Sequence, residues 1–105
     1  MDLKQIKYFL AVSEHGSVAS AAASLNLAQP SLSQQIKNLE NSLNTELFTR
    51  TSRGVTLTLA GKQFKSHCNE ILALVSSAVE EVKSVGSNIS GSVVIGFPSS
   101  VSMVL

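Results

Sequence analysis

A long apolar stripe in the second half of the chain constrains the fold more than any other feature. Seven positions follow each other at alternating steps of four and three, namely Phe64, Cys68, Ile71, Val75, Ala78, Val82 and Val85, and Leu72 and Val79 widen the stripe. This spacing predicts one amphipathic helix over residues 59–86, roughly 28 residues and about 42 Å long. Such a helix exceeds the core of a small domain. Because two-fold dimers dominate homo-oligomers, we expect a second copy to cover the stripe.

Three shorter helices are predicted before this one. The first carries a stripe of Leu3, Ile6, Phe9, Leu10 and Val12. Gly16 ends it, and Ser17 is a good N-cap for an alanine-rich second helix over 18–25. Pro30 suits the first turn of a third helix, whose apolar positions are Leu32, Ile36, Leu39 and Leu43. Asn44 tolerates the left-handed conformation that ends a helix.

A small hairpin is predicted between the third and fourth helices. The runs 47–49 and 55–57 are prone to form strands and flank a polar turn at 52–54, after which Thr58 caps the long helix. The fold class is therefore mainly α, a winged helix-turn-helix of three helices and a two-stranded wing, followed by a long dimerisation helix. We expect a head at 1–58, the long helix at 59–86, and at 87–105 a hinge with the first strand of a truncated effector-binding domain.

Composition limits the possible functions. A chain of 105 residues with a net charge of +1 does not by its bulk charge indicate nucleic-acid binding. One cysteine excludes an internal disulfide and suits a reducing compartment. Neither a signal peptide nor an apolar run long enough for a membrane span is recognisable. We expect a cytoplasmic protein without membrane contact, metal, cofactor or enzymatic activity, because no nucleophile, base or ligand set assembles around His15 or His67.

The second and third helices, separated by a tight break, match a helix-turn-helix, in which the second helix presents its first turns to the major groove of DNA. The polar or exposed residues there are Gln29, Pro30, Ser31, Ser33, Gln34 and Lys37. Glutamine can bond to adenine through two atoms, and serine to bases or phosphates. The alternative is an ordinary solvated helix face.

The chain resembles the N-terminal domain of LysR-type transcriptional regulators over residues 3–61. The residues that carry the resemblance are Phe9, Gly16, Ser17, Ala21, Ala22, Leu25, Gln29, Pro30, Ser31, Leu32, Ser33, Ile36, Leu39, Glu40, Leu43, Leu47, Phe48, Arg50, Arg53, Leu57, Thr58 and Gly61. Two positions depart from the family pattern: Gln34 stands where arginine is frequent, which leaves the preferred base open, and Asn44 replaces a glycine.

The resemblance implies roles for several residues. Gln29, Pro30, Ser33 and Gln34 would face bases, and Arg53 in the wing would follow the DNA backbone or minor groove. The long helix would join two copies through Phe64, Cys68, Ile71, Leu72, Val75, Ala78, Val79 and Val82. A strand from Ser92 would begin an effector domain resembling periplasmic binding proteins, with Ser99 and Ser100 near its ligand.

Three residues keep alternative interpretations. Arg50 either bonds to backbone carbonyls beside the core or reaches a phosphate. Glu40 is interpreted as orienting a neighbouring basic group, and Cys68 as a small apolar residue of the stripe, with redox sensing as a minor alternative.

The favoured function is a regulator that binds double-stranded DNA at a pseudo-palindromic operator as a homodimer. A higher oligomer would be possible in a longer parent, and a small-molecule effector only if the missing domain is present. The alternative is a helical protein-interaction module without sequence-specific DNA binding.

Overall fold

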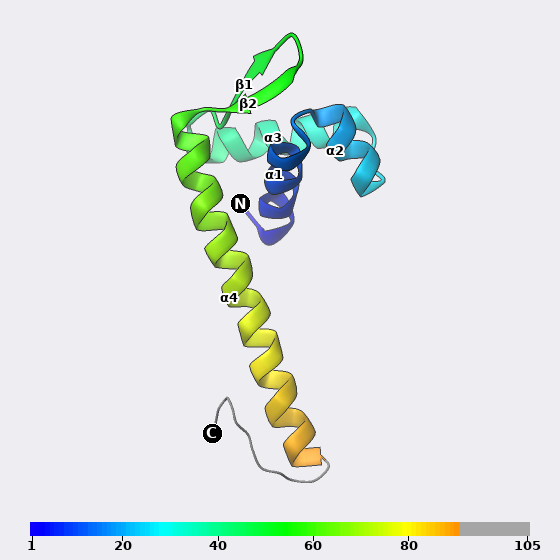
Figure 1. Ribbon diagram of the computed structural model, residues 1–105, viewed down its shortest axis with the longest axis vertical. Helices are drawn as coiled ribbons and strands as arrows, with labels where there is room; N and C mark the ends of the chain where they lie inside the picture. Colours follow the sequence, from blue (N-terminus) through cyan, green and yellow to red (C-terminus); the bar gives the residue numbers. More distant parts are fainter. Residues whose placement is uncertain (91–105) are drawn as a thin grey trace. The chain divides into compact units, whose positions relative to one another are not determined.

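The computed structural model describes residues 1–90, and the side chains of 88–90 are not discussed. In chain order the elements are α1 (Leu3–His15), α2 (Val18–Leu25), α3 (Gln29–Leu43), β1 (Phe48–Thr51), β2 (Gly54–Leu57) and α4 (Leu59–Ser90) (Figure 1). This is the expected mainly α, winged helix-turn-helix architecture. The expected strand from Ser92, with Ser99 and Ser100, lies outside the described residues. The chain forms two compact units, 1–69 and 70–105, so α4 contributes to both.

Local hydrogen bonds explain where the first helices begin and end. The Asp2 carboxylate accepts from the Gln5 N–H at 2.8 Å, and the Ser17 hydroxyl accepts from the Ser20 N–H at 3.1 Å. Gly16 ends α1 with a φ of 76°, and Asn44 ends α3 with a φ of 53°. These ends confirm the predicted stop at Gly16, the cap at Ser17 and the left-handed asparagine.

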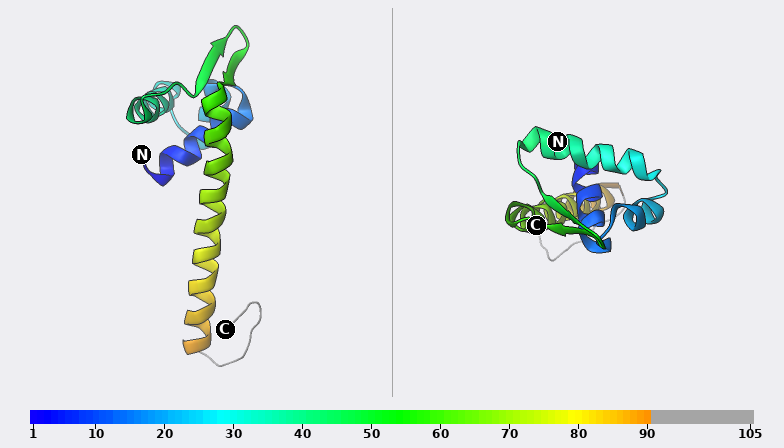
Figure 2. Two further views of the ribbon diagram at one scale, coloured as in Figure 1. Left: turned by 90° about the vertical axis from the view of Figure 1, so that its left-hand side faces the viewer. Right: turned by 90° about the horizontal axis from the view of Figure 1, so that it is seen from above.

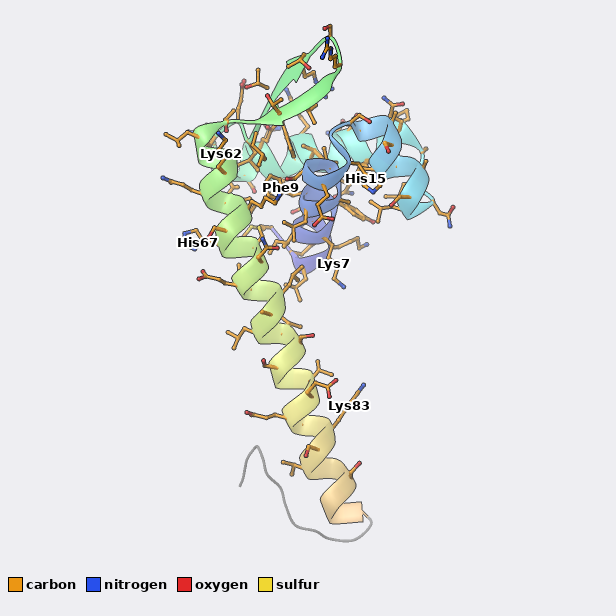
Figure 3. The ribbon with its side chains drawn as sticks, in the orientation of Figure 1. Lys7, Phe9, His15, Lys62, His67 and Lys83 are labelled. Carbon is orange, nitrogen blue, oxygen red and sulfur yellow. The ribbon has the colours of Figure 1, made fainter. Side chains whose placement is uncertain are left out.

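The core of the first unit forms where α1, α2 and α3 meet beneath the hairpin. Its largest fully buried side chains are Phe9, Leu32, Leu39, Leu47, Val12 and Cys68. The Phe9 ring lies 5.2 Å from that of Phe48 and 4.9 Å from that of Phe64, centroid to centroid (Figure 3). One aromatic side chain of α1 therefore joins the wing and the first turns of α4 to the helical core.

The wing is an antiparallel hairpin whose register pairs Phe48 with Leu57 and Thr51 with Gly54. It projects from the helices, as the two views of Figure 2 show. Its turn end is anchored to the helices because the Val55 N–H donates to the Gly16 carbonyl at 2.9 Å. Gly54 has a φ of 140°, and a Cβ there would collide with the same Gly16 carbonyl oxygen. Glycine is therefore required for this close approach of wing and helical turn.

The start of α4 is tied to the segment before β1. The Thr58 hydroxyl accepts from the Gly61 N–H at 3.0 Å and donates to the Glu46 carbonyl at 2.8 Å. A Cβ on Gly61 would collide with the Leu47 carbonyl oxygen. Thr58 is thus the predicted cap, and the first compact unit continues into α4 as far as Asn69, beyond the head boundary expected at 58.

In the second unit, α4 continues farther than the sequence predicted. The hinge expected from 87 is wrong over 87–90, because α4 remains helical to Ser90. A single glycine inside a helix costs only about 1 kcal/mol relative to alanine, so Gly86 is compatible with a continuous helix. Within residues 1–90, no helix is both long and apolar enough to span a bilayer.

Candidate nucleic-acid interface

The surface of α3 opposite the core is polar and open to solvent. Leu32, Ile36 and Leu39 are buried, whereas the residues on the other side recur at steps of four, three and four, namely Pro30, Gln34, Lys37 and Asn41, and all are exposed. Gln29 and Ser31 are exposed as well, and Ser33 is half-buried at the edge nearest the wing. The fold therefore gathers all six predicted α3 residues at the start of one helix.

The N-terminus of α3 differs from those of α1 and α2. Ala28 occupies the N-cap position, and no side chain caps this end. Proline within the first turn removes one of the N–H groups that would otherwise need a partner. The remaining N–H groups and the positive end of the helix dipole face outward beside Gln29, which favours an anion at this point.

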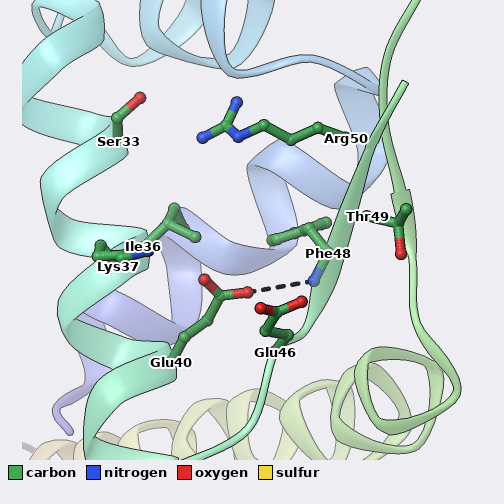
Figure 4. A pocket seen from close by; sticks show the side chains of 8 residues that line it. All are labelled: Ser33, Ile36, Lys37, Glu40, Glu46, Phe48, Thr49 and Arg50. Carbon is green, nitrogen blue, oxygen red and sulfur yellow. Dashed lines mark hydrogen bonds between the residues drawn. The ribbon is translucent and has the colours of Figure 1, made fainter. Parts of the chain in front are cut away.

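A groove separates α3 from β1 (Figure 4). It has a volume of about 260 Å³ and is lined by Ser33, Ile36, Lys37, Glu40, Glu46, Phe48, Thr49 and Arg50. The Arg50 side chain leaves β1 and extends toward Ser33 (Figure 4). It is exposed, so its guanidinium is open to solvent at the Ser33 end of the groove. Contact of Arg50 with a phosphate stays a prediction.

Glu40 has a different role from the one expected. Its carboxylate Oε2 accepts from the Leu47 N–H at 2.7 Å and from the Phe48 N–H at 3.2 Å. The interpretation that Glu40 orients a basic group stays a prediction beside this observed role. Leu47 and Phe48 lie in the core, so the carboxylate stabilises two part-buried N–H groups and sets the position of β1 relative to α3.

Arg53 lies in the turn of the wing and is exposed. Thr51 shapes this turn: its hydroxyl accepts from the Arg53 N–H at 3.2 Å and donates to the Gly54 carbonyl at 3.3 Å. The backbone that carries Arg53 is therefore held by the hairpin, while the side chain is free to reach a partner.

Two amide pairs on α3 were missed by sequence reasoning. Gln34 Nε2 donates to Asn38 Oδ1 at 2.9 Å, and Gln5 Nε2 on α1 donates to Gln35 Oε1 at 3.4 Å. The first pair has the i, i+4 spacing at which glutamine and asparagine side chains meet on a helix, so the spacing alone could have indicated it. The second joins residues thirty positions apart and needed the tertiary structure.

The two units have opposite net charges. Residues 1–69 contain seven lysines and arginines against four aspartates and glutamates, a charge of +3. Residues 70–105 contain one lysine against three glutamates, a charge of −2. The nearly neutral total thus conceals a basic head, because the first turns of α4 add Lys62 and Lys65 to it.

The stripe predicted for dimerisation divides between the units. Cys68 is fully buried within a single chain, and the burial raises the pKa of its thiol. Its assignment to a surface for a second copy is therefore corrected, while Phe64 is half-buried against Phe9. In the second unit Ile71 and Leu72 are half-buried and Ala78 is exposed, and the exposed fractions of Val75, Val79 and Val82 are 37%, 44% and 71%.

Among residues 1–90, no three histidine, cysteine or acidic side chains come together in a way that could hold a metal ion.

Comparison with known families and structures identifies the domain. Residues 3–62 match the family described as bacterial regulatory helix-turn-helix protein, lysR family. The chain belongs to this family. Among its LysR-family relatives, the HTH-type transcriptional regulator BudR of Klebsiella aerogenes is 42% identical over 100 residues, covering 95% of this chain and 70% of BudR. The nitrogen assimilation regulatory protein nac of Escherichia coli (strain K12) is 45% identical over 97 residues, covering 92% of this chain but only 32% of that regulator. These relatives are named as regulators, in agreement with the expectation that the chain is not an enzyme.

Solved structures support the same assignment. The crystal structure of the CbnR_DBD–DNA complex matches with a TM-score of 0.79 and 36% identity, over 82% of this chain and 99% of that one. The BenM_DBD/benA site 1 DNA complex matches with a TM-score of 0.78 and 40% identity, over 81% and 99% respectively. The described fold is therefore that of the DNA-binding domains of LysR regulators.

Proposed function

We propose that this chain binds a specific DNA sequence as the reading head of a transcription regulator, with α3 in the major groove. The observation that carries the proposal is the exposed polar face of α3, which begins at an uncapped helix end and lies on a unit with a charge of +3. Two of the solved structures that it matches are DNA complexes by name. A DNA partner also supports a cytoplasmic location.

The proposed roles follow from position. Gln34 lies at the centre of the outward face, and with Gln29 and Pro30 it would face base edges. Ser33, at the edge nearest the wing, would also face a base, and the contacts to phosphates or sugars would come from Ser31, Lys37, Arg50 and Arg53. Arg53, on the hairpin turn, would reach the backbone or the minor groove beside the half-site.

The second copy would lie along the exposed part of α4. Val75, Val79 and Val82 are accessible, and with Ile71, Leu72 and Ala78 they form a continuous apolar strip that is costly to leave in water. Two heads held by this strip would read a pseudo-palindromic operator, since a two-fold protein pair matches two related half-sites. The chain spans about a third of the E. coli regulator, and an effector domain and a higher oligomer would be features of a longer protein.

Selection of binding sites from random duplexes, followed by footprinting of the selected site, tests the DNA proposal. We expect a preferred sequence, loss of the footprint in the double variant Ser33→Ala/Gln34→Ala, and retained dimerisation. If a dimer neutralises about eight phosphates, a plot of the logarithm of the binding constant against the logarithm of salt concentration should have a slope of about −7. A flat salt response without any selected site would contradict the proposal.

Sedimentation of point variants tests the dimer separately. Val75→Asp and Val82→Asp place a charge on the apolar strip and are expected to shift the chain to monomer. Ala73→Asp is the matched control, because Ala73 is also exposed on α4 but lies on the opposite face. Equal dimerisation of all three variants would contradict an interface along this strip, whereas dimer loss without any DNA phenotype would favour a protein-interaction module.

A further inference from the structure

Gln34 does not stand alone on the outward face of α3. Its Nε2 donates to Asn38 Oδ1 at 2.9 Å, and both side chains are exposed one turn apart. An exposed glutamine ordinarily samples several rotamers and both orientations of its terminal amide. In the structure the Gln34 amide is oriented with its nitrogen toward the Asn38 oxygen.

The bond to Asn38 leaves a defined set of groups on Gln34. An amide nitrogen carries two hydrogens, and Asn38 uses one of them. The Gln34 Oε1 acceptor and the second N–H donor remain available. Side by side, these two groups match the N6 donor and N7 acceptor of adenine in the major groove. Guanine presents two acceptors at that edge, so it would leave Oε1 without a donor.

We propose that Asn38 is a positioning residue that fixes the Gln34 amide for adenine and so determines specificity at one position of each half-site. This inference rests on the proposed DNA-binding function and adds to it a residue, a base and a direction of hydrogen bonding. Asn38 acts before DNA arrives, because an amide that is already oriented loses less side-chain entropy on binding. Asn38 is not itself required to touch a base.

The test uses the complete chain and base preference as its readout. Wild-type protein first selects sites from random duplexes, and Gln34→Ala identifies the position that Gln34 reads. Affinities are then measured on duplexes that carry adenine or guanine at that position. For Asn38→Ala we expect the preference for adenine to fall by about three- to tenfold, the effect of one hydrogen bond. Preferences at the other positions stay unchanged.

Two further variants separate positioning from other effects. Asn38→Asp keeps an oxygen that accepts from Gln34, so the preference ratio is retained although the added negative charge weakens binding to all duplexes. Asn41→Ala is the matched control, because Asn41 is an exposed asparagine one turn farther along the same face, and it leaves the ratio unchanged. Thermal melting of each variant shows that α3 is intact.

The remaining outcomes overturn either the role of Asn38 alone or the proposed DNA-binding function as well. An unchanged adenine preference in Asn38→Ala would overturn the inference while leaving the proposed function in place. A change at a different base position in Asn38→Ala would also overturn it, because Asn38 would then read a base directly. Failure of wild-type protein to select any site would overturn the proposed function, and this inference with it.

Discussion

Replacement of Glu40 by alanine tests how the wing is held against α3. The carboxylate accepts from two N–H groups, those of Leu47 at 2.7 Å and Phe48 at 3.2 Å, and Leu47 is only 2% exposed. Hydrogen bonds to a charged acceptor contribute about 1.5–3 kcal/mol each, and their loss leaves buried donors unpaired. Because Glu40 is half-buried and the second bond is long, we take the low end for both. Glu40→Ala should therefore lower the free energy of unfolding by about 3 kcal/mol.

Urea denaturation followed by circular dichroism measures this loss. With a slope of about 1.5 kcal/mol per molar urea, the midpoint should fall by about 2 M. Glu40→Gln keeps an oxygen acceptor and should lose only about 1 kcal/mol. Glu46→Ala is the control, because Glu46 lines the same groove with an exposed side chain, and its loss should change stability by no more than about 0.5 kcal/mol.

DNA binding provides a second readout for the same variants. Loss of either carboxylate removes one negative charge near the proposed interface, so electrostatics alone would tighten binding equally in both. Weaker binding in Glu40→Ala and tighter binding in Glu46→Ala would show that Glu40 positions the wing. Equal stability of the two alanine variants, within about 0.5 kcal/mol, would show that the Glu40 carboxylate does not hold the strand entrance.

Two other predictions concern Gly54 at the turn end of the wing and the buried thiol. Gly54→Ala should destabilise the head by about 1–3 kcal/mol and weaken DNA binding, because its φ is 140° and a Cβ would strike the Gly16 carbonyl. Thermal melting measures this loss. Gly86→Ala is the control, because a Cβ there meets no other atom and should stabilise α4 slightly. Iodoacetamide should modify Cys68 more slowly in folded than in urea-unfolded protein, and equal rates would contradict its burial. Because burial raises the thiol pKa above its ordinary value of 9.0, the protonated thiol's stabilisation is complete below that value and is lost as pH rises through the raised pKa. The difference in unfolding free energy between wild type and Cys68→Ala should therefore stay constant at neutral pH and shrink only in alkali.

Local rules predicted most of the elements. The end of α1 at Gly16, the cap of α2 at Ser17, the proline in the first turn of α3 and the cap of α4 at Thr58 depend on neighbouring backbone atoms. Apolar periodicity likewise separated the buried face of α3 from its polar face, because helix geometry fixes which positions lie on the same side. The end of α4 was misplaced because glycine and serine each disfavour a helix by only about 1 kcal/mol or less, and the helix continues through them.

The sequence by itself determined which residues of α3 face outward, since helical periodicity assigns a face to each position. Only the tertiary structure decided that Glu40 binds the strand entrance, that Gly54 must approach Gly16, and that Cys68 belongs to the head rather than to the surface of α4. Each of these depends on atoms distant in the chain meeting at a particular separation. The four–three repeat is the same whether a second helix or the chain's own core covers it, and packing alone distinguishes the two.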